Sequence, residues 1–209
     1  MRFQFDHRPG QLSACLRRFA NDERGATAIE FAAVIGPFLF LLFGIMSVGF
    51  YFFVVFSLEH AVESASRVIR TGQEQTMTSV PSGTPTSTAG QPASKADWFR
   101  QQICNKLPPF MHTGTNCNAI RINVQKFAGY GSITTPSCLN NTGALIPASS
   151  QTYNTGDANE IVLVSVCYEW ELTRTMISIP YWISPGAGRM TNGSTLIQAA
   201  TTFTNEPFR

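Results

Sequence analysis

The chain has 209 residues, enough for one or two domains, and its 15 Lys and Arg against 13 Asp and Glu give a formal net charge of +2. This net charge indicates nothing specific about nucleic acid, and because the sequence has no cluster of Lys or Arg we expect no nucleic-acid partner. Hydrophobic residues make up 44% of the chain, and many of them fall in one segment.

That segment, Phe31–Leu58, contains no charged side chain. About 20 apolar residues cross the hydrocarbon core of a bilayer, so the segment is long enough to span it once. It is longer than the hydrophobic region of a signal peptide, typically about 7–15 residues. Arginines precede it, whereas Glu59 and Glu63 follow it before the first cation, Arg67. The bias of Lys and Arg therefore predicts a cytoplasmic N-terminus and places the chain after Leu58 outside the cytoplasm.

The helical pattern continues beyond the apolar segment. Apolar residues recur on one helix face as far as Ile69, and Gly72 lies where a C-terminal cap belongs. We expect one helix from about Thr27 to Thr71, about 65–70 Å long at 1.5 Å per residue. About a third of it would stand outside the bilayer and remain amphipathic, so another element should pack against it.

Pro37 and a row of small residues mark the first part of this helix. Pro37 removes a main-chain hydrogen bond and should kink the helix. Ala28, Ala32 and Gly36 recur at four-residue spacing, a pattern that lets membrane helices approach closely. The alternative is that small residues are simply common in membrane helices.

The remainder predicts a linker and a small domain. More than half of Gly72–Lys95 is Gly, Pro, Ser or Thr, which indicates a linker or mobile loop. Ala93–Leu107 has helical spacing, with Ser94 as its cap and Asp97 three residues later. Three strands of an antiparallel sheet are expected at Ala119–Phe127, Glu160–Leu172 and Ser194–Asn205, with a possible edge piece at Ile177–Ile183. The fold class is therefore α+β: a long N-terminal transmembrane helix that continues outside the membrane, then a small antiparallel-sheet domain.

Four of the five cysteines follow the membrane segment, in a compartment that would be oxidising. They predict two disulfides, for which three connectivities exist. We favour Cys104–Cys117 and Cys138–Cys167 because these pairs close the shorter loops. The spacing does not match that of zinc ligands, so we expect no metal site. Two disulfides would compensate for a small core.

Catalytic signatures are missing from the sequence. It contains no G-x-S-x-G, no H-E-x-x-H and no glycine loop of the kind that binds phosphate. The acidic stretch Asn154–Glu160 lacks the ligands of a calcium loop and predicts a turn before a strand. We expect a protein without enzymatic activity or cofactor.

The stretch RGATAIEF (Arg24–Phe31) leaves two interpretations open. Glycine allows a protease to approach the Gly25–Ala26 bond, and cleavage would create an amine that could pair with Glu30 of a neighbouring chain. The simpler interpretation is that Glu30 is an interfacial glutamate in the first helical turn, where the helix dipole favours a carboxylate. Judged by spacing alone, this interpretation is the favoured one.

The segment Arg24–Gly72 resembles the TadE-like family, pilin-like membrane proteins of the Tad (tight adherence, Flp-type) pilus system. The family pattern starts R-G-x-x-x-x-E-F, has a proline soon afterwards and a long apolar helix, and ends A-A-R-x-x-x-x-G. The matching residues are Arg24, Gly25, Glu30, Phe31, Pro37, Ala65, Arg67 and Gly72, with Ser66 in place of the second alanine. The C-terminal Asn205–Phe208 also resembles the family's terminus.

The resemblance implies cleavage after Gly25 by prepilin peptidase, an aspartic protease of the inner membrane, which makes Ala26 the mature N-terminus. Glu30, followed by Phe31, would pair with the N-terminus of a neighbouring subunit during assembly. The implied partners are prepilin peptidase, the lipid bilayer, other pilin-like subunits and Tad inner-membrane assembly proteins. The implied location is the inner (cytoplasmic) membrane, with a periplasmic C-terminal domain and a role in pilus assembly and adherence.

Four parts are therefore expected: a cleaved cytoplasmic leader (1–25), the TadE-like helix (26–72), a linker (73–95) and an extracytoplasmic α+β domain (96–209). The main alternative is an uncleaved single-pass anchor that displays a binding module. An envelope enzyme has almost no support in the sequence.

Overall fold

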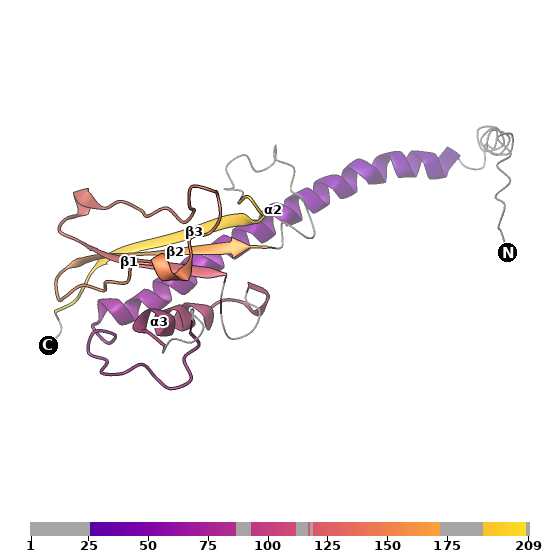
Figure 1. Cartoon of the computed structure of the whole chain (residues 1–209). Coiled ribbons are helices and arrows are strands. Elements are labelled where there is room, and N and C mark those ends of the chain that lie inside the picture. Colours follow the sequence, from indigo (N-terminus) through magenta and orange to yellow (C-terminus); the bar gives the residue numbers. More distant parts are fainter. Residues whose placement is uncertain (1–25, 87–92, 112–116, 118, 172–189, 208–209) are drawn as a thin grey trace, which may run out of the picture. The chain divides into compact units, whose positions relative to one another are not determined.

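The computed structural model describes residues 26–86, 93–111, 117, 119–171 and 190–207. The chain divides into two compact units, residues 1–51 and 52–209. The helices and strands, in chain order, are α2 (Ala26–Arg70), α3 (Lys95–Cys104), β1 (Ile120–Phe127), β2 (Ile161–Trp170) and β3 (Thr195–Thr204) (Figure 1). The predicted α+β class, with a long N-terminal apolar helix and a small antiparallel sheet, is confirmed.

Helix α2 begins and ends within one residue of the predicted bounds. Pro37 lies inside it, and the helix continues through this residue, so the expected kink stays a prediction. The Ser47 hydroxyl donates a hydrogen bond to the Phe43 carbonyl oxygen at 2.7 Å. Ser57 does the same with Phe53 at 2.7 Å. Each serine is thus satisfied by its own helix, which suits an apolar environment.

The C-terminus of α2 ends in a Schellman motif. Gly72 has φ +76°, its amide donates to the Ile69 carbonyl at 3.0 Å, and the Gln73 amide donates to Val68 at 3.1 Å. A left-handed residue at this position is usually glycine, because glycine has no Cβ to clash. The predicted cap at Gly72 is confirmed.

Helix α3 starts at a capping box. The Ser94 hydroxyl accepts from the Asp97 amide at 3.1 Å, and the Asp97 carboxylate accepts from the Ser94 amide at 2.9 Å. Asp97 also pairs with Arg100 at 2.8 Å, and both side chains are buried. The predicted cap is confirmed, and the helix is shorter than predicted, since it ends at Cys104.

The sheet has the order β1-β2-β3, with both pairs antiparallel. The central strand β2 is buried along nearly its whole length. Ile122, Val166 and Ala199 are cross-strand neighbours and all are buried. The part of α2 within residues 52–209 supplies further buried side chains, namely Val54, Leu58, Ala61, Val62, Ala65 and Ile69. The amphipathic end of the helix is thus covered by its own domain.

The long connection from β1 to β2 packs against the sheet. Arg121, Cys167 and Gln198 are cross-strand neighbours, one on each strand. Arg121 Nε donates to the Ile146 carbonyl at 2.9 Å, and Gln198 Nε2 donates to that of Pro136 at 3.3 Å. Cys167 is bonded to Cys138. Each of the three strands is therefore joined to this connection by one residue of the same cross-strand row.

The structure contains the disulfides Cys104–Cys117 and Cys138–Cys167, which are the pairs favoured from the sequence. Their Cα atoms lie 6.2 Å and 5.8 Å apart, within the usual range for disulfides. All four cysteines are buried.

The segment predicted as a linker is folded where it begins. Residues 71–76 form turns, Glu74 is only 1% exposed, and Gln75 Nε2 donates to the Thr155 carbonyl at 3.2 Å. Composition did not reveal this, because the partner lies far along the chain. The boundaries 73–95 and 96–209 stay predictions, and the possible edge piece Ile177–Ile183 lies outside the described residues.

Candidate functional site along helix α2

Glu30 and Phe31 are exposed on α2. Glu30 is the fifth residue of the described helix, so the first turn holds no acidic side chain. The helix dipole acts mainly within the first turn, and this position weakens the interpretation of Glu30 as a dipole-stabilising residue. Gly25, on the other side of the expected cleavage bond, lies outside the described residues.

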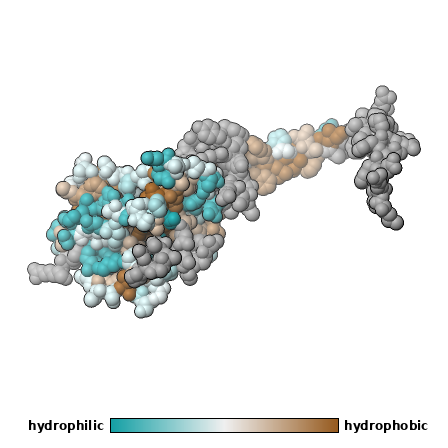
Figure 2. Space-filling model, viewed as in Figure 1, coloured by the Kyte–Doolittle hydropathy of each residue, from teal (hydrophilic) through white to brown (hydrophobic). Residues whose placement is uncertain are grey.

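Large apolar side chains cover the surface of α2 from Ile29 to Phe56. Figure 2 shows this hydrophobic surface along the helix, whereas the visible face of the sheet domain is largely hydrophilic. The apolar part of a soluble core helix would be mostly buried, and little of this one is. A helix of this length and composition near the N-terminus is typical of a single-pass membrane anchor.

Three glycines lie on the apolar helix at Gly36, Gly44 and Gly49. A Cβ atom built at any of them would meet no heavy atom within 4 Å. Packing within the described chain therefore does not require glycine there. Ala32 and Gly36 are exposed and have small or no side chains, so a second helix could approach this face closely.

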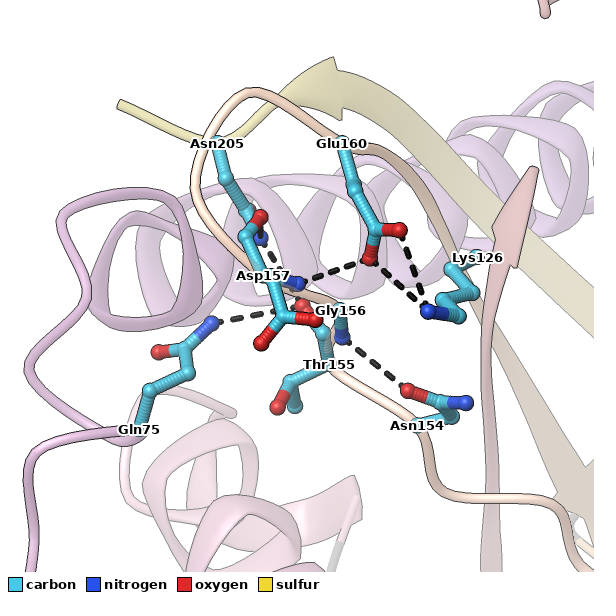
Figure 3. Close-up of polar contacts among 8 residues, drawn as sticks. All are labelled: Gln75, Lys126, Asn154, Thr155, Gly156, Asp157, Glu160 and Asn205. Atoms are coloured by element: carbon cyan, nitrogen blue, oxygen red, sulfur yellow. Dashed lines mark hydrogen bonds and ion pairs between the residues drawn. The ribbon is translucent and has the colours of Figure 1, made fainter. Parts of the chain in front are cut away.

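At the other end of α2 three chain segments meet at one carbonyl group. The Thr155 carbonyl oxygen accepts from Gln75 Nε2 at 3.2 Å and from Asn205 Nδ2 at 2.9 Å (Figure 3). Asn205 Nδ2 also donates to the Asp157 carbonyl at 3.0 Å, and its side chain is almost fully buried. Asn205 thus joins the C-terminal segment to the turn before β2.

That turn is held by its own acidic residue. The Glu160 carboxylate accepts from the Asp157 amide at 2.8 Å and from Lys126 Nζ at 3.0 Å (Figure 3). The Asp157 amide, and then Lys126, lower the pKa of Glu160. Gly156 has φ +65°, and a Cβ there would lie 2.9 Å from the carboxylate. The predicted turn before β2 is confirmed. Separately, among the described residues no group of three or more His, Cys, Asp or Glu could hold a metal ion.

Glu74 is a buried carboxylate next to the same junction. Burial raises its pKa, while the Thr155 side chain and the charge of Lys95 oppose that shift. Lys95 Nζ donates to the Glu74 carbonyl at 3.0 Å. Neither carboxylate oxygen has a hydrogen bond of good geometry within the described part of the chain. The sequence does not mark Glu74 as a candidate, since nothing in a Gly/Ser/Thr-rich stretch distinguishes one residue as buried.

A family model described as TadE-like protein matches residues 25–67. This segment is TadE-like. The match contains Gly25, Ala26, Glu30, Phe31 and Pro37 and confirms the resemblance found from the sequence motifs. Searches against curated proteins and against solved structures gave no match for the chain.

The TadE-like family suggests a role in assembly related to the Tad pilus. The TadE-like segment ends at Arg67, just before the junction that holds the helix end. The Gly72 cap and the Asn205–Phe208 terminus are each recognisable from the sequence. The meeting of the helix end with Asn205 and Glu206 at one junction is not, because those contacts join residues far apart in the chain.

Proposed function

We propose that this protein is a non-enzymatic, membrane-anchored pseudopilin or minor pilin that takes part in Tad (Flp-type) pilus assembly and adherence. The observation that carries the proposal is the TadE-like match over residues 25–67 on a helix whose apolar surface is exposed. Such a surface suits the lipid bilayer before assembly and the helices of neighbouring subunits after assembly.

In this proposal prepilin peptidase cleaves after Gly25, and Ala26 becomes the N-terminus. The Glu30 carboxylate then pairs with the Ala26 amine of a neighbouring subunit. A carboxylate in apolar surroundings is costly unless it is paired. The exposure of Glu30 on α2 supports this role, because the side chain is accessible to another subunit.

The protein is proposed to lie in the inner membrane with its N-terminus in the cytoplasm and its sheet domain in the periplasm. The arginines before the apolar segment favour this orientation. The two disulfides also favour it, since disulfides persist in oxidising compartments. The proposed partners are other pilin-like subunits and Tad inner-membrane assembly proteins.

N-terminal sequencing of the protein from membranes with active prepilin peptidase tests the processing step. The wild-type chain should start at Ala26, and Gly25→Leu should leave the longer precursor. Gly36→Leu is the matched control, because it changes a glycine with open space around it outside the cleavage site. Recovery of the wild-type chain with Met1 intact would refute the proposal.

A second experiment separates the proposed pseudopilin from an uncleaved anchor that displays a binding module. Glu30→Gln should be processed and inserted normally but should be lost from purified pili or from co-purified pilin-like subunits. Glu59→Gln, an exposed glutamate at the other end of the apolar segment, should behave like wild type. Normal assembly of Glu30→Gln would favour the simple anchor.

A further inference from the structure

An exposed aromatic side chain of the sheet domain lies against helix α2. The short 3-10 turn Pro109–Met111 follows α3, and its Phe110 ring stacks on that of Phe53, with centroids 6.0 Å apart and planes at 28°. Despite this contact Phe53 and Phe110 are 52% and 51% exposed. Both residues belong to the unit 52–209.

Two more phenylalanines extend the exposed surface. Phe52 and Phe56 stack with centroids 6.2 Å apart, and both are exposed. We call these four residues the Phe patch: Phe52, Phe53, Phe56 and Phe110. Three of them belong to the apolar segment predicted to cross the membrane, whereas Phe110 comes from a different part of the chain.

The turn that carries Phe110 is fixed to the domain. Its last residue, Met111, is buried, and the Met111 carbonyl accepts a hydrogen bond from the Tyr168 hydroxyl at 2.8 Å. Burial raises the pKa of Tyr168 to about 12, so this hydroxyl remains a donor at physiological pH. Phe110 is therefore presented outward by a turn whose other side is anchored on strand β2.

We infer that the Pro109–Met111 turn is a second membrane contact, with Phe110 in the interfacial layer of the bilayer that α2 crosses. At 1.5 Å per residue Phe31–Phe53 extends about 33 Å, slightly more than the hydrocarbon core of about 30 Å. Phe53 then lies near the outer membrane–water interface, and Phe110 lies beside it. Val54, the next residue, is fully buried within the domain, so no spacer separates the domain from the membrane.

A lipid surface suits the Phe patch because three of its four residues belong to the apolar segment proposed to cross the bilayer. Pro109 is exposed next to Phe110, and the exposed Lys106 lies shortly before the turn, where its long side chain could reach lipid headgroups. The inference rests on membrane insertion of α2. A protein partner on the Phe patch is the competing possibility, and the experiment distinguishes it.

The test uses the full chain in nanodiscs that hold one copy each. Phe110→Trp adds a fluorophore to the patch, and its added emission is measured against the parent chain. We expect lipids brominated on their acyl chains to remove most of this added emission, and aqueous iodide to remove little.

Tyr130→Trp is the control. Tyr130 is 62% exposed, and its hydroxyl lies 2.8 Å from that of Thr204, next to the junction at the far end of α2. Its added emission should respond to iodide and not to brominated lipids.

Quenching of Phe110→Trp by iodide alone would overturn the inference, because the patch would then face water. Emission that resists both quenchers would also overturn it, since protein would then cover the patch. Extraction of the wild-type chain from membranes by alkaline carbonate would instead refute the membrane anchor itself. A photoactivatable lipid provides a readout without mutation: it should label the wild-type peptide that contains Phe110 and not the one that contains Tyr130.

Discussion

Arg70 and Glu206 are joined twice. The Glu206 amide donates to the Arg70 carbonyl at 2.8 Å, and Arg70 Nε lies 3.3 Å from Glu206 Oε1. The main-chain bond satisfies one of the carbonyls that a helix leaves unpaired at its C-terminus. The ion pair contributes little by comparison, because its side chains are 55% and 53% exposed. The buried Asn205 beside it should hold this junction more strongly.

We predict that Asn205→Ala destabilises the protein by about 2 kcal/mol. It removes two side-chain hydrogen bonds and the buried group that joins β3 to the turn at Thr155. Glu206→Gln, which keeps the main-chain bond, should cost less than about 1 kcal/mol. Chemical denaturation of the full chain in detergent measures both. Equal losses for the two variants would contradict this order.

Gly72→Ala should destabilise the helix end by about 1 kcal/mol, because φ at Gly72 is +76°. Gly129→Ala is the matched control, since Gly129 has an extended backbone and open space around its Cβ position. It should be neutral within about 0.5 kcal/mol. Thermal unfolding of both variants gives the comparison, and a neutral Gly72→Ala would argue against the Schellman motif.

Glu74 predicts a specific pH dependence. Burial raises the pKa of Glu74 in the folded state above its unfolded value of about 4.3. Below that value the carboxyl group is protonated in both states and does not reduce the free energy of unfolding. As the pH rises through the folded pKa, the buried carboxyl group ionises and the protein loses stability. Glu74→Gln should therefore match the parent at low pH and be more stable at neutral pH. Urea unfolding from pH 3 to 8 measures the difference.

In the same experiment, the effect of Glu160→Gln on stability should change with pH in the opposite direction. The Asp157 amide and Lys126 lower the pKa of Glu160, so its contribution is present above the unfolded pKa and is lost as the pH falls through the folded pKa. This variant should be less stable than the parent at neutral pH and equal to it at low pH. Parallel pH profiles for Glu74→Gln and Glu160→Gln would show that the two environments do not differ as described.

The disulfides predict a mass lower by two hydrogens per bond under non-reducing conditions. Peptide mapping should recover Cys104 with Cys117 and Cys138 with Cys167. Replacing Cys138 and Cys167 together by serine should cost about 2–4 kcal/mol of stability. Four free thiols in the domain of the membrane-inserted protein would contradict both the bonds and the proposed periplasmic location.

The sequence by itself determined the features that depend on local pattern. An uncharged segment predicted helix α2, Gly72 its cap, and Ser94 with Asp97 the start of α3. Alternating apolar residues predicted β1, and β-prone runs of residues predicted β2 and β3, each to within a residue or two. Each signal lies within a few residues of the element that it specifies. The motif with Gly25 and Glu30 is equally local, and the role proposed for these two residues rests on the family resemblance and not on the fold.

Only the tertiary structure decided which distant residues meet. The Thr155 carbonyl receives hydrogen bonds from Gln75 and Asn205, and Phe110 stacks on Phe53. Neither contact leaves a periodic signal, because each joins single residues whose proximity depends on packing of the whole domain. The burial of Glu74 arises in the same way, since composition describes a segment and not the surface that it will face.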